Sequence, residues 1–349
     1  MGMTYHIIGA GISGLAAAQR LKLQHPGCKV VIYEAANHPG GRIFSFYDRR
    51  LGVEIDNATH VILGANPLAC SRLKAEDFHK KCTFYDLEKQ KLSRQVWKFG
   101  AEIVKAASNT DPQQTAPSIK RTLWRKLFPF TPGKRKIYYS RGDLSQKLIM
   151  PLLRYADEIY FGWTLKAAEQ SNQRVNALVF NRGRRVELGK EDQVISAVDA
   201  HNAARLFSLP AYEFNEITNI FYLTSQPLYL PGNNKFLGLR GGMADWVFVN
   251  GNIVSVTVSN SAFLPKDKDE LARRTWLELG KIRGMVPAFM PKYRVIRHKR
   301  ATIRQDEANN RNRGAAAGLP LKNLKIIGDW TETNFPACIE AALRSARRV

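Results

Sequence analysis

Residues 5–34 read YHIIGAGISGLAAAQRLKLQHPGCKVVIYE, and this stretch decides the fold. Its first five residues are mostly apolar and predict a short buried strand. Residues 12–24 follow with apolar side chains at helical spacing, and the turn His25-Pro26-Gly27 ends them. Residues 29–34 are rich in β-branched side chains and predict a second strand. The stretch therefore predicts a strand–helix–strand unit of about 30 residues, the opening of a Rossmann-like α/β fold.

Three glycines between the first strand and the helix carry a binding function. Gly9, Gly11 and Gly14 follow the pattern G-x-G-x-x-G, which permits a tight turn, a close approach to a pyrophosphate and close helix packing. The first turn of the helix, which contains Ser13, presents free N–H groups to the phosphates. Glu34 ends the second strand 20 residues after Gly14, where an acidic side chain binds a ribose hydroxyl. These residues predict a dinucleotide site.

NAD and FAD both fit this pattern, and three features favour FAD. Gly40-Gly41-Arg42 stands at a spacing that resembles the extended flavoprotein fingerprint, and an arginine there reaches phosphate oxygens. No second glycine motif is present for a separate nicotinamide domain. The strand Ile326-Ile327-Gly328-Asp329 resembles the C-terminal flavin motif, in which the aspartate binds the ribityl chain. A helix that begins near Ala337 would then face the pyrimidine ring.

The predicted contacts with FAD come from both ends of the chain. The predicted cofactor-binding residues are Gly9, Gly11, Ser13, Gly14, Glu34, Ala35, Gly41, Arg42, Asn57, Gly328, Asp329, Ala337 and Ile339.

The remaining chain predicts a second domain that interrupts the first. We expect an FAD-binding domain of the two-dinucleotide-binding-domain flavoprotein type from residues 1–66, 134–205 and 300–349. An interleaved α+β substrate domain that faces a membrane is expected from residues 67–133 and 206–299. The four cysteines lack metal-ligand spacing, so the sequence predicts free thiols and no metal.

The net charge of +23 on 349 residues favours a polyanionic partner, either nucleic acid or an anionic bilayer. No zinc finger, RNP pattern or helix-turn-helix is apparent, so we expect no nucleic-acid partner. No run of 18 or more apolar residues predicts a membrane-spanning helix. The chain runs from Met1 directly into its first strand without a signal peptide, which predicts a cytoplasmic location.

Further motifs extend along the whole chain and carry a family resemblance. They are Asp56-Asn57-Ala58-Thr59-His60, Leu63-Gly64-Ala65-Asn66, Arg141-Gly142-Asp143-Leu144, GGMADWVF at 241–248, SVTVS at 255–259, Lys299-Arg300-Ala301-Thr302, GDWTET at 328–333, Pro336-Ala337 and Ile339-Glu340. With these motifs the chain resembles the flavin amine oxidase and carotenoid desaturase superfamily. Within it, the chain is similar to the squalene-associated hydroxysqualene dehydroxylases of bacterial hopanoid pathways.

The sequence departs from the family pattern in four places. Ala58 and Ala341 stand where the family tends to have glycine, and Cys338 stands where it has threonine. The region from Pro67 to Pro132 is short for the family, which puts the shape of the substrate entrance in question.

The resemblance implies conversion of hydroxysqualene to squalene with reduced flavin and an unidentified electron donor. Loss of an allylic hydroxyl leaves a delocalised cation, which aromatic faces stabilise. Trp246 and Phe248 are candidates for that role, although packing in a strand explains them equally. His60 and Asp56 are the candidate polar groups near the flavin, and a structural hydrogen-bonding role for His60 stays open.

A squalene-like substrate resides in a bilayer, so we expect peripheral association with the inner face of the cell membrane. Residues 118–130 (SIKRTLWRKLFPF) form an amphipathic pattern that suits a helix in the membrane interface. An ordinary surface helix has the same pattern. Two other functions stay open: a carotenoid-type desaturase or amine oxidase, which run oxidatively, and a basic nucleic-acid-binding protein on a Rossmann scaffold.

Overall fold

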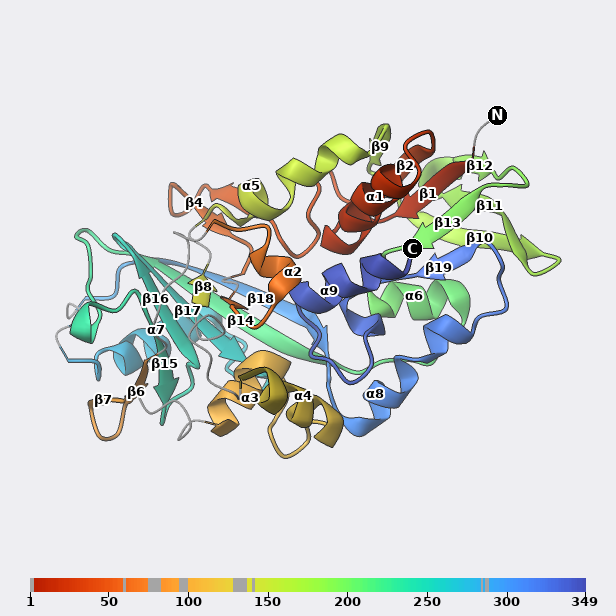
Figure 1. The fold of residues 1–349 in the computed structure, drawn as a ribbon. Coiled ribbons are helices and arrows are strands. Elements are labelled where there is room, and N and C mark those ends of the chain that lie inside the picture. The colour runs from red at the N-terminus through yellow and green to blue at the C-terminus, as the bar shows by residue number, and fades with distance from the viewer. Residues whose placement is uncertain are drawn as a thin grey trace.

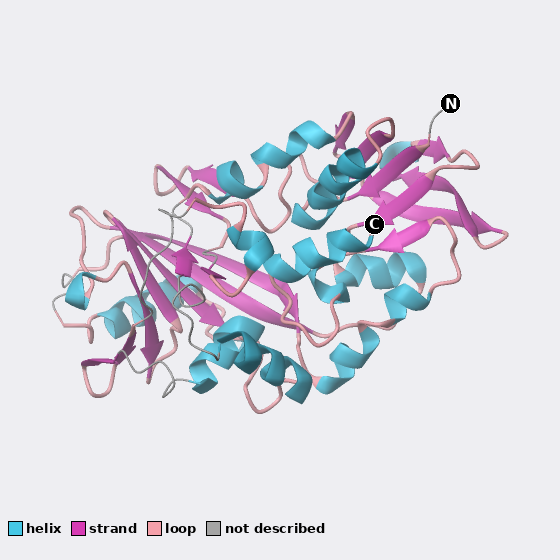
Figure 2. Ribbon diagram, viewed as in Figure 1, coloured by secondary structure: helices cyan, strands magenta, loops and turns pink. Residues whose placement is uncertain are grey.

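The computed structural model describes residues 3–58, 61–74, 83–93, 100–127, 137–139, 142–283, 285 and 289–349. Two groups of strands stand apart, with helices around and between them (Figures 1 and 2). Both termini lie beside the same group, on the right of Figure 1.

A five-stranded parallel sheet forms the first group, in the order β19-β13-β1-β2-β9. Its strands are β1 (Thr4–Ile8), β2 (Lys29–Glu34), β9 (Glu158–Phe161), β13 (Gln193–Ser196) and β19 (Leu324–Ile326). Helices α1 (Ile12–Gln24) and α9 (Ile339–Ser345) share one buried cluster with one face of this sheet. The predicted opening unit is confirmed.

An antiparallel meander covers the opposite face of the parallel sheet. Its strands are β10 (Leu165–Ser171), β11 (Arg174–Phe180) and β12 (Arg185–Glu187). Leu178 and Phe180 pack against Ile8 and Val31 of the parallel sheet. The meander is the second layer of a Rossmann-like flavoprotein fold, which confirms the predicted α/β class.

The second group is a seven-stranded sheet in the order β18-β14-β17-β16-β15-β6-β7. Its strands are β6 (Phe84–Asp86), β7 (Lys91–Ser93), β14 (Phe214–Leu223), β15 (Phe236–Arg240), β16 (Trp246–Asn250), β17 (Ile253–Ser259) and β18 (Lys292–Ile303). Helix α7 (Lys268–Leu279) packs on one face through Leu271 and Trp276.

The other face of this sheet, called the inner face below, contacts two small hairpins. Strands β3 (Ser45–Asp48) and β4 (Val53–Asp56) pair with each other, and so do β5 (Val61–Leu63) and β8 (Ile137–Tyr139). Ile55 packs on Phe221 of β14, and Tyr139 packs on Phe248 of β16. Along the chain, β3, β4 and β5 follow β2 and β8 precedes β9, so the hairpins connect the inner face to the parallel sheet.

Short helices complete the fold. They are α2 (Pro67–Cys70), α3 (Gly100–Ser108), α4 (Pro117–Leu127), α5 (Leu144–Leu148), α6 (Ala200–Phe207), α8 (Glu307–Asn312), and the 3-10 turns η4 (Met150–Tyr155), η5 (Asn181–Gly183), η6 (Pro231–Asn233), η7 (Ser261–Phe263), η8 (Ala315–Gly318), η9 (Asp329–Thr331) and η10 (Ala346–Arg348). Within the described ranges, no helix combines the length and the apolar character needed to span a bilayer.

Candidate active site

The glycine loop has the geometry that its spacing predicts. Gly9 has φ of +105°, a conformation that side chains disfavour. A Cβ on Gly14 would lie 2.1 Å from the Gly9 carbonyl oxygen, so helix α1 packs against the loop only without a side chain there. A Cβ on Gly11 would meet no atom within 4 Å. The loop is therefore closed on the protein side and open at Gly11, which fits a bound pyrophosphate.

The Gly40-Gly41-Arg42 loop lies directly beside the first loop. The Gly40 N–H donates to the Ala10 carbonyl over 2.8 Å, and Gly11 and Gly40 form a parallel bridge. A Cβ on Gly41 would lie 3.6 Å from the Gly11 Cα. The two predicted phosphate-binding segments thus form one surface.

Hydrogen bonds of Glu34 connect the phosphate-binding surface to the end of β2. Its carboxylate accepts hydrogen bonds from the N–H groups of Ala10 at 2.7 Å and Ala36 at 2.8 Å, while the side chain is buried. Ala35 is exposed beside it, and Ser13 is buried in the first turn of α1. Each carboxylate oxygen keeps a second lone pair for a ribose hydroxyl. Glu34 therefore has a structural role, and its contact with a ribose stays a prediction.

Arg42 connects the two ends of the chain at this surface. Its guanidinium donates to the Asp329 carboxylate over 2.6 Å and to the Ala301 carbonyl over 2.8 Å. Asp329 is buried and Arg42 is half exposed. The charge of Asp329 raises the pKa of Arg42. The structure thus brings the predicted phosphate-binding arginine and the predicted ribityl-binding aspartate into one ion pair.

A buried arginine that the sequence analysis missed holds the backbone around Asp329. The Arg313 guanidinium donates to the carbonyls of Asp329, Trp330 and Phe335 over 2.8–2.9 Å. Only 1% of Arg313 is exposed, and burial lowers its pKa to about 10. It lies in the basic stretch NNRNRG at 309–314, where the sequence gives no sign of which arginine is buried.

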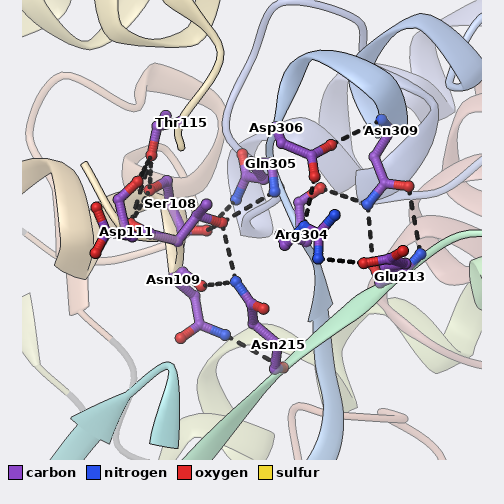
Figure 3. Close-up of polar contacts among 11 residues, drawn as sticks. Ser108, Asn109, Asp111, Thr115, Glu213, Asn215, Arg304, Gln305, Asp306 and Asn309 are labelled. Carbon is purple, nitrogen blue, oxygen red and sulfur yellow. Dashed lines mark hydrogen bonds and ion pairs between the residues drawn. The ribbon is translucent and has the colours of Figure 1, made fainter. Parts of the chain in front are cut away.

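A buried glutamine fixes the other end of the C-terminal flavin motif. Gln305 is 1% exposed, and its Oε1 accepts from the Ala337 N–H over 3.0 Å. Its Nε2 donates to the Ser108 carbonyl over 2.6 Å, and its N–H donates to the Thr110 hydroxyl. Figure 3 shows Gln305 within this polar network, next to Ser108. Helix α9 begins at Ile339, so Gln305 connects the segment before that helix to the end of α3.

Of the three predicted catalytic residues, His60 lies outside the described residues. Asp56 is buried and accepts hydrogen bonds from the Ser45 hydroxyl at 2.6 Å and the Gly142 N–H at 2.9 Å. These bonds join hairpin β3–β4 to the start of α5. Asn57 follows it, and its carbonyl lies 3.0 Å from the Nε2 of His298 on β18.

Trp246 lies on the inner face within a cluster of aromatic rings. Its ring centroid is 5.6 Å from that of Phe84 and 6.3 Å from those of Phe236 and Phe248. Phe248 and Asp56 both line a small cavity of about 30 Å³ between the inner face and hairpin β3–β4. Phe248 and Asp56 thus lie at one cavity, whose lining also includes Glu54, Asn250 and Ser255.

A larger hollow of about 430 Å³ lies elsewhere and includes none of the predicted site residues. Its lining residues are Pro67, Leu68, Glu332, Glu340, Arg344 and Arg347. Because most of these side chains are charged, this hollow is unsuited to a long apolar substrate.

Helix α4 forms where the amphipathic pattern predicts a helix, but its apolar half is covered by α3. Ile119 and Leu123 of α4 are buried against Val104 of α3, so the prediction that this half meets a membrane is wrong for these two residues. The structure differs because two amphipathic helices shield each other. Trp124 stays 43% exposed, and Arg121 is exposed as well.

The fold and the cofactor surface together define an FAD-dependent oxidoreductase. The chain belongs to the flavin-containing amine oxidoreductase family, whose model matches residues 152–349. A model of NAD(P)-binding Rossmann-like domains matches residues 7–73. The glycine cradle, Glu34, Arg42 and Asp329 fit FAD, which is the cofactor of this enzyme.

The most similar relatives point to one branch of that family. The chain is 29% identical over 416 aligned positions to the hydroxysqualene dehydroxylase of Rhodopseudomonas palustris, covering 100% of this chain and 97% of the relative. It is 32% identical over 414 positions to that of Zymomonas mobilis, covering 98% and 97%. The first alignment spans 416 positions against 349 residues here, so at least 67 positions have no residue in this chain.

Solved structures share the fold at low identity. An oxidoreductase from Methanosarcina mazei matches with a TM-score of 0.69 at 14% identity, covering 99% of each chain. A putrescine oxidase bound to putrescine matches with a TM-score of 0.65 at 12% identity, covering 100% of this chain and 98% of the other.

Proposed function

We propose that this enzyme converts hydroxysqualene to squalene by reductive dehydroxylation. The observation that carries the proposal is similarity along nearly the whole chain to relatives named hydroxysqualene dehydroxylase. The aromatic inner face supports it, because a long isoprenoid chain needs apolar surroundings over much of its length.

The reaction replaces a carbon–oxygen bond with a carbon–hydrogen bond. The allylic hydroxyl leaves with the electron pair of its bond and takes up a proton to become water, and the carbon accepts a hydride. FAD held by the glycine loop, Arg42 and Asp329 would supply the hydride in its reduced form, and a separate two-electron donor would be needed to reduce it again. The protein must hold the cation dry and close to the flavin until the hydride arrives.

Three of the predicted residues have a role in this proposal. The ring of Trp246 would stabilise the allylic cation through its π face, as aromatic rings do for other cations. His60 and Asp56 are the candidate polar groups on the flavin side. Asp56 would act through the backbone it holds, because its carboxylate already accepts hydrogen bonds from Ser45 and Gly142.

The direction of hydride flow tests the proposal against other members of the family. Reduced enzyme is mixed without oxygen with hydroxysqualene, and oxidised enzyme is mixed with putrescine or with a carotenoid precursor. We expect flavin oxidation and squalene in the first mixture and no flavin reduction in the others. Flavin reduction by an amine or a polyene, with no squalene from the reduced enzyme, would overturn the assignment.

We also propose peripheral association with an anionic membrane. The net charge of +23 supports it, as do the exposed Arg121 and Arg125 beside Trp124 on α4. Each basic residue near an anionic surface contributes about 1 kcal/mol. We expect co-sedimentation with vesicles that contain phosphatidylglycerol and little with phosphatidylcholine alone. Equal sedimentation with both would contradict an electrostatic contribution.

A further inference from the structure

Three rows of side chains cross the inner face of the seven-stranded sheet. Directly paired residues of neighbouring strands share a face, and the next residue on that face lies two positions along the strand. Phe221 of β14 pairs with Ser255 of β17, and both line the small cavity. Two residues earlier on β14, Asn219 pairs with Thr257. Thr257 also pairs with Trp246 of β16, so these three residues form one row.

The third row leads towards the flavin side. Ile217 of β14 pairs with His298 of β18, whose ring contacts the Asn57 carbonyl. Asn57 is one of the predicted flavin contacts, and Ala301 of the same strand accepts from Arg42. The row of Asn219 therefore lies between the row of Phe221 and Ser255, which line the cavity, and the row of His298, about 7 Å from each.

Asn219 has a hydrogen-bonding group without a partner. Its side chain is 0% exposed, and its Oδ1 accepts from the Thr257 hydroxyl over 2.9 Å. This bond turns the Nδ2 group to the opposite side of the amide. Within the described part of the chain, Nδ2 donates to no acceptor. Buried polar groups are nearly always paired, so an unpaired amide donor in this position requires an explanation.

We propose that Asn219 is a catalytic residue that donates a hydrogen bond from Nδ2 to the hydroxyl oxygen of the isoprenoid alcohol. This inference rests on the proposed function and identifies the group that recognises its substrate. An amide N–H does not release its proton at neutral pH, so Asn219 binds and polarises the departing oxygen, and the hydroxide takes up its proton from solvent after it leaves the dry site. Thr257 fixes the orientation of the amide.

The same row supplies a surface for the positive charge. Neighbouring strands are about 4.8 Å apart, so the backbones of Asn219 and Trp246 are separated by about 10 Å. Asn219 and Trp246 thus stand on the same face of the sheet, with Thr257 between them. One row therefore carries both the donor for the leaving oxygen and the candidate ring for the cation.

The test compares binding and single turnover in three variants of the FAD-loaded enzyme. Asn219→Leu removes the amide with little change in volume, and Thr257→Val removes the hydroxyl that orients it. Asn176→Leu, at an exposed position of the meander, is the matched control. The dissociation constants of hydroxysqualene and squalene are measured through the flavin spectrum in detergent micelles, and reoxidation of reduced flavin by hydroxysqualene is followed without oxygen.

We expect Asn219→Leu to reduce flavin reoxidation about 100-fold, the usual effect of losing one donor to a developing negative charge. Its preference for hydroxysqualene over squalene should fall about tenfold, while affinity for squalene and the melting temperature stay at wild-type levels or rise. Thr257→Val should show a smaller loss, and Asn176→Leu none.

Two results would overturn the inference: wild-type preference and rate in Asn219→Leu, or equal loss of affinity for both lipids together with a lower melting temperature. Failure of the proposed function has a different signature. In that case reduced wild-type enzyme forms no squalene, yet a binding preference for the alcohol that Asn219→Leu abolishes would still support the donor role. If the wild-type enzyme binds hydroxysqualene and squalene equally well, the donor role of Asn219 is contradicted.

Discussion

Arg42 and Asp329 form an ion pair of 2.6 Å across 287 positions of sequence. Arg42 follows the first strand–helix–strand unit, and Asp329 follows the last strand of the parallel sheet. Their contact closes the cofactor surface, because it joins the loop expected at the phosphates to the loop expected at the ribityl chain.

Loss of this pair should weaken FAD binding. We expect Arg42→Ala to raise the dissociation constant of FAD at least tenfold, which is about 1.4 kcal/mol, because Asp329 loses the cation that orients it. Arg274→Ala is the control, since Arg274 pairs with Glu270 on the distant helix α7. Quenching of FAD fluorescence on titration with apoprotein measures the constant. Equal constants in both variants would show that the pair does not organise the site.

Gly11 and Gly14 should respond differently to the same substitution. Gly11→Ala places a methyl group in open space and should leave the apoprotein stable, but it should weaken FAD binding at least tenfold. Gly14→Ala collides with the Gly9 carbonyl and should lower the free energy of unfolding by about 1–3 kcal/mol. Urea unfolding and FAD titration separate the two effects. Unchanged FAD affinity in a folded Gly11→Ala would place the pyrophosphate elsewhere.

Arg313 should contribute to stability as well as to cofactor retention. Arg313→Met leaves three carbonyl groups without their charged donor, and we expect a loss of about 3 kcal/mol or more in urea unfolding of the apoprotein. FAD content should fall too, because the Asp329 loop loses its anchor. Arg311→Met, at an exposed position near the end of α8, should change neither quantity. Similar stability of the two variants would refute this role.

His6 should make the parallel sheet sensitive to acid. It is buried on β1 beside the Tyr33 hydroxyl, and burial lowers its pKa below the usual value of 6.5. Below pH 6.5 the histidine of the unfolded chain is protonated, whereas His6 of the folded chain stays neutral down to its lowered pKa. The free energy of unfolding therefore decreases as the pH falls from 6.5 to that lowered pKa.

The expected result is a free energy of unfolding that decreases as pH falls through this window, and a smaller decrease in His6→Phe. His201→Phe, at an exposed position, should keep the wild-type slope. A wild-type slope in His6→Phe would assign the acid sensitivity to other groups.

The parts of the fold that depend on local pattern could be predicted. The helix at 12–24 and the strand at 29–34 have the predicted bounds, because the helical spacing of the first and the run of β-branched residues in the second are local signals. Local sequence also explains the hairpins β11–β12 and β16–β17, because the turn residues Asn181-Arg182-Gly183 and Asn250-Gly251-Asn252 lie between their strands.

The other elements depend on contacts between distant segments, which local sequence patterns do not show. The basic stretch at 292–303 is strand β18, whose arginines pair with acids from other segments, such as Arg294 with Asp48. Charges on both faces of a strand remove the alternation that identifies it. Strands β6 and β7 come from the segment 67–133 but extend the seven-stranded sheet by pairing with β15, a contact between distant segments.

Some residues of the candidate site could be predicted from the sequence, and others could not. The G-x-G-x-x-G spacing indicates the role of its glycines, so Gly9, Gly11 and Gly14 could be predicted. Gln305, Arg313 and Asn219 were missed because nothing in their neighbouring residues distinguishes a buried polar group from an exposed one. Only the tertiary structure reveals which backbone groups they bind.

A single turnover in deuterated water tests the central claim most directly. The enzyme is reduced without oxygen in D2O, where the transferable hydrogen of reduced flavin exchanges with solvent, and hydroxysqualene is added in limiting amount. The account predicts flavin oxidation in equal amount to squalene, with one deuterium on the carbon that carried the hydroxyl. Squalene without deuterium, or flavin that stays reduced beside unchanged hydroxysqualene, would contradict it.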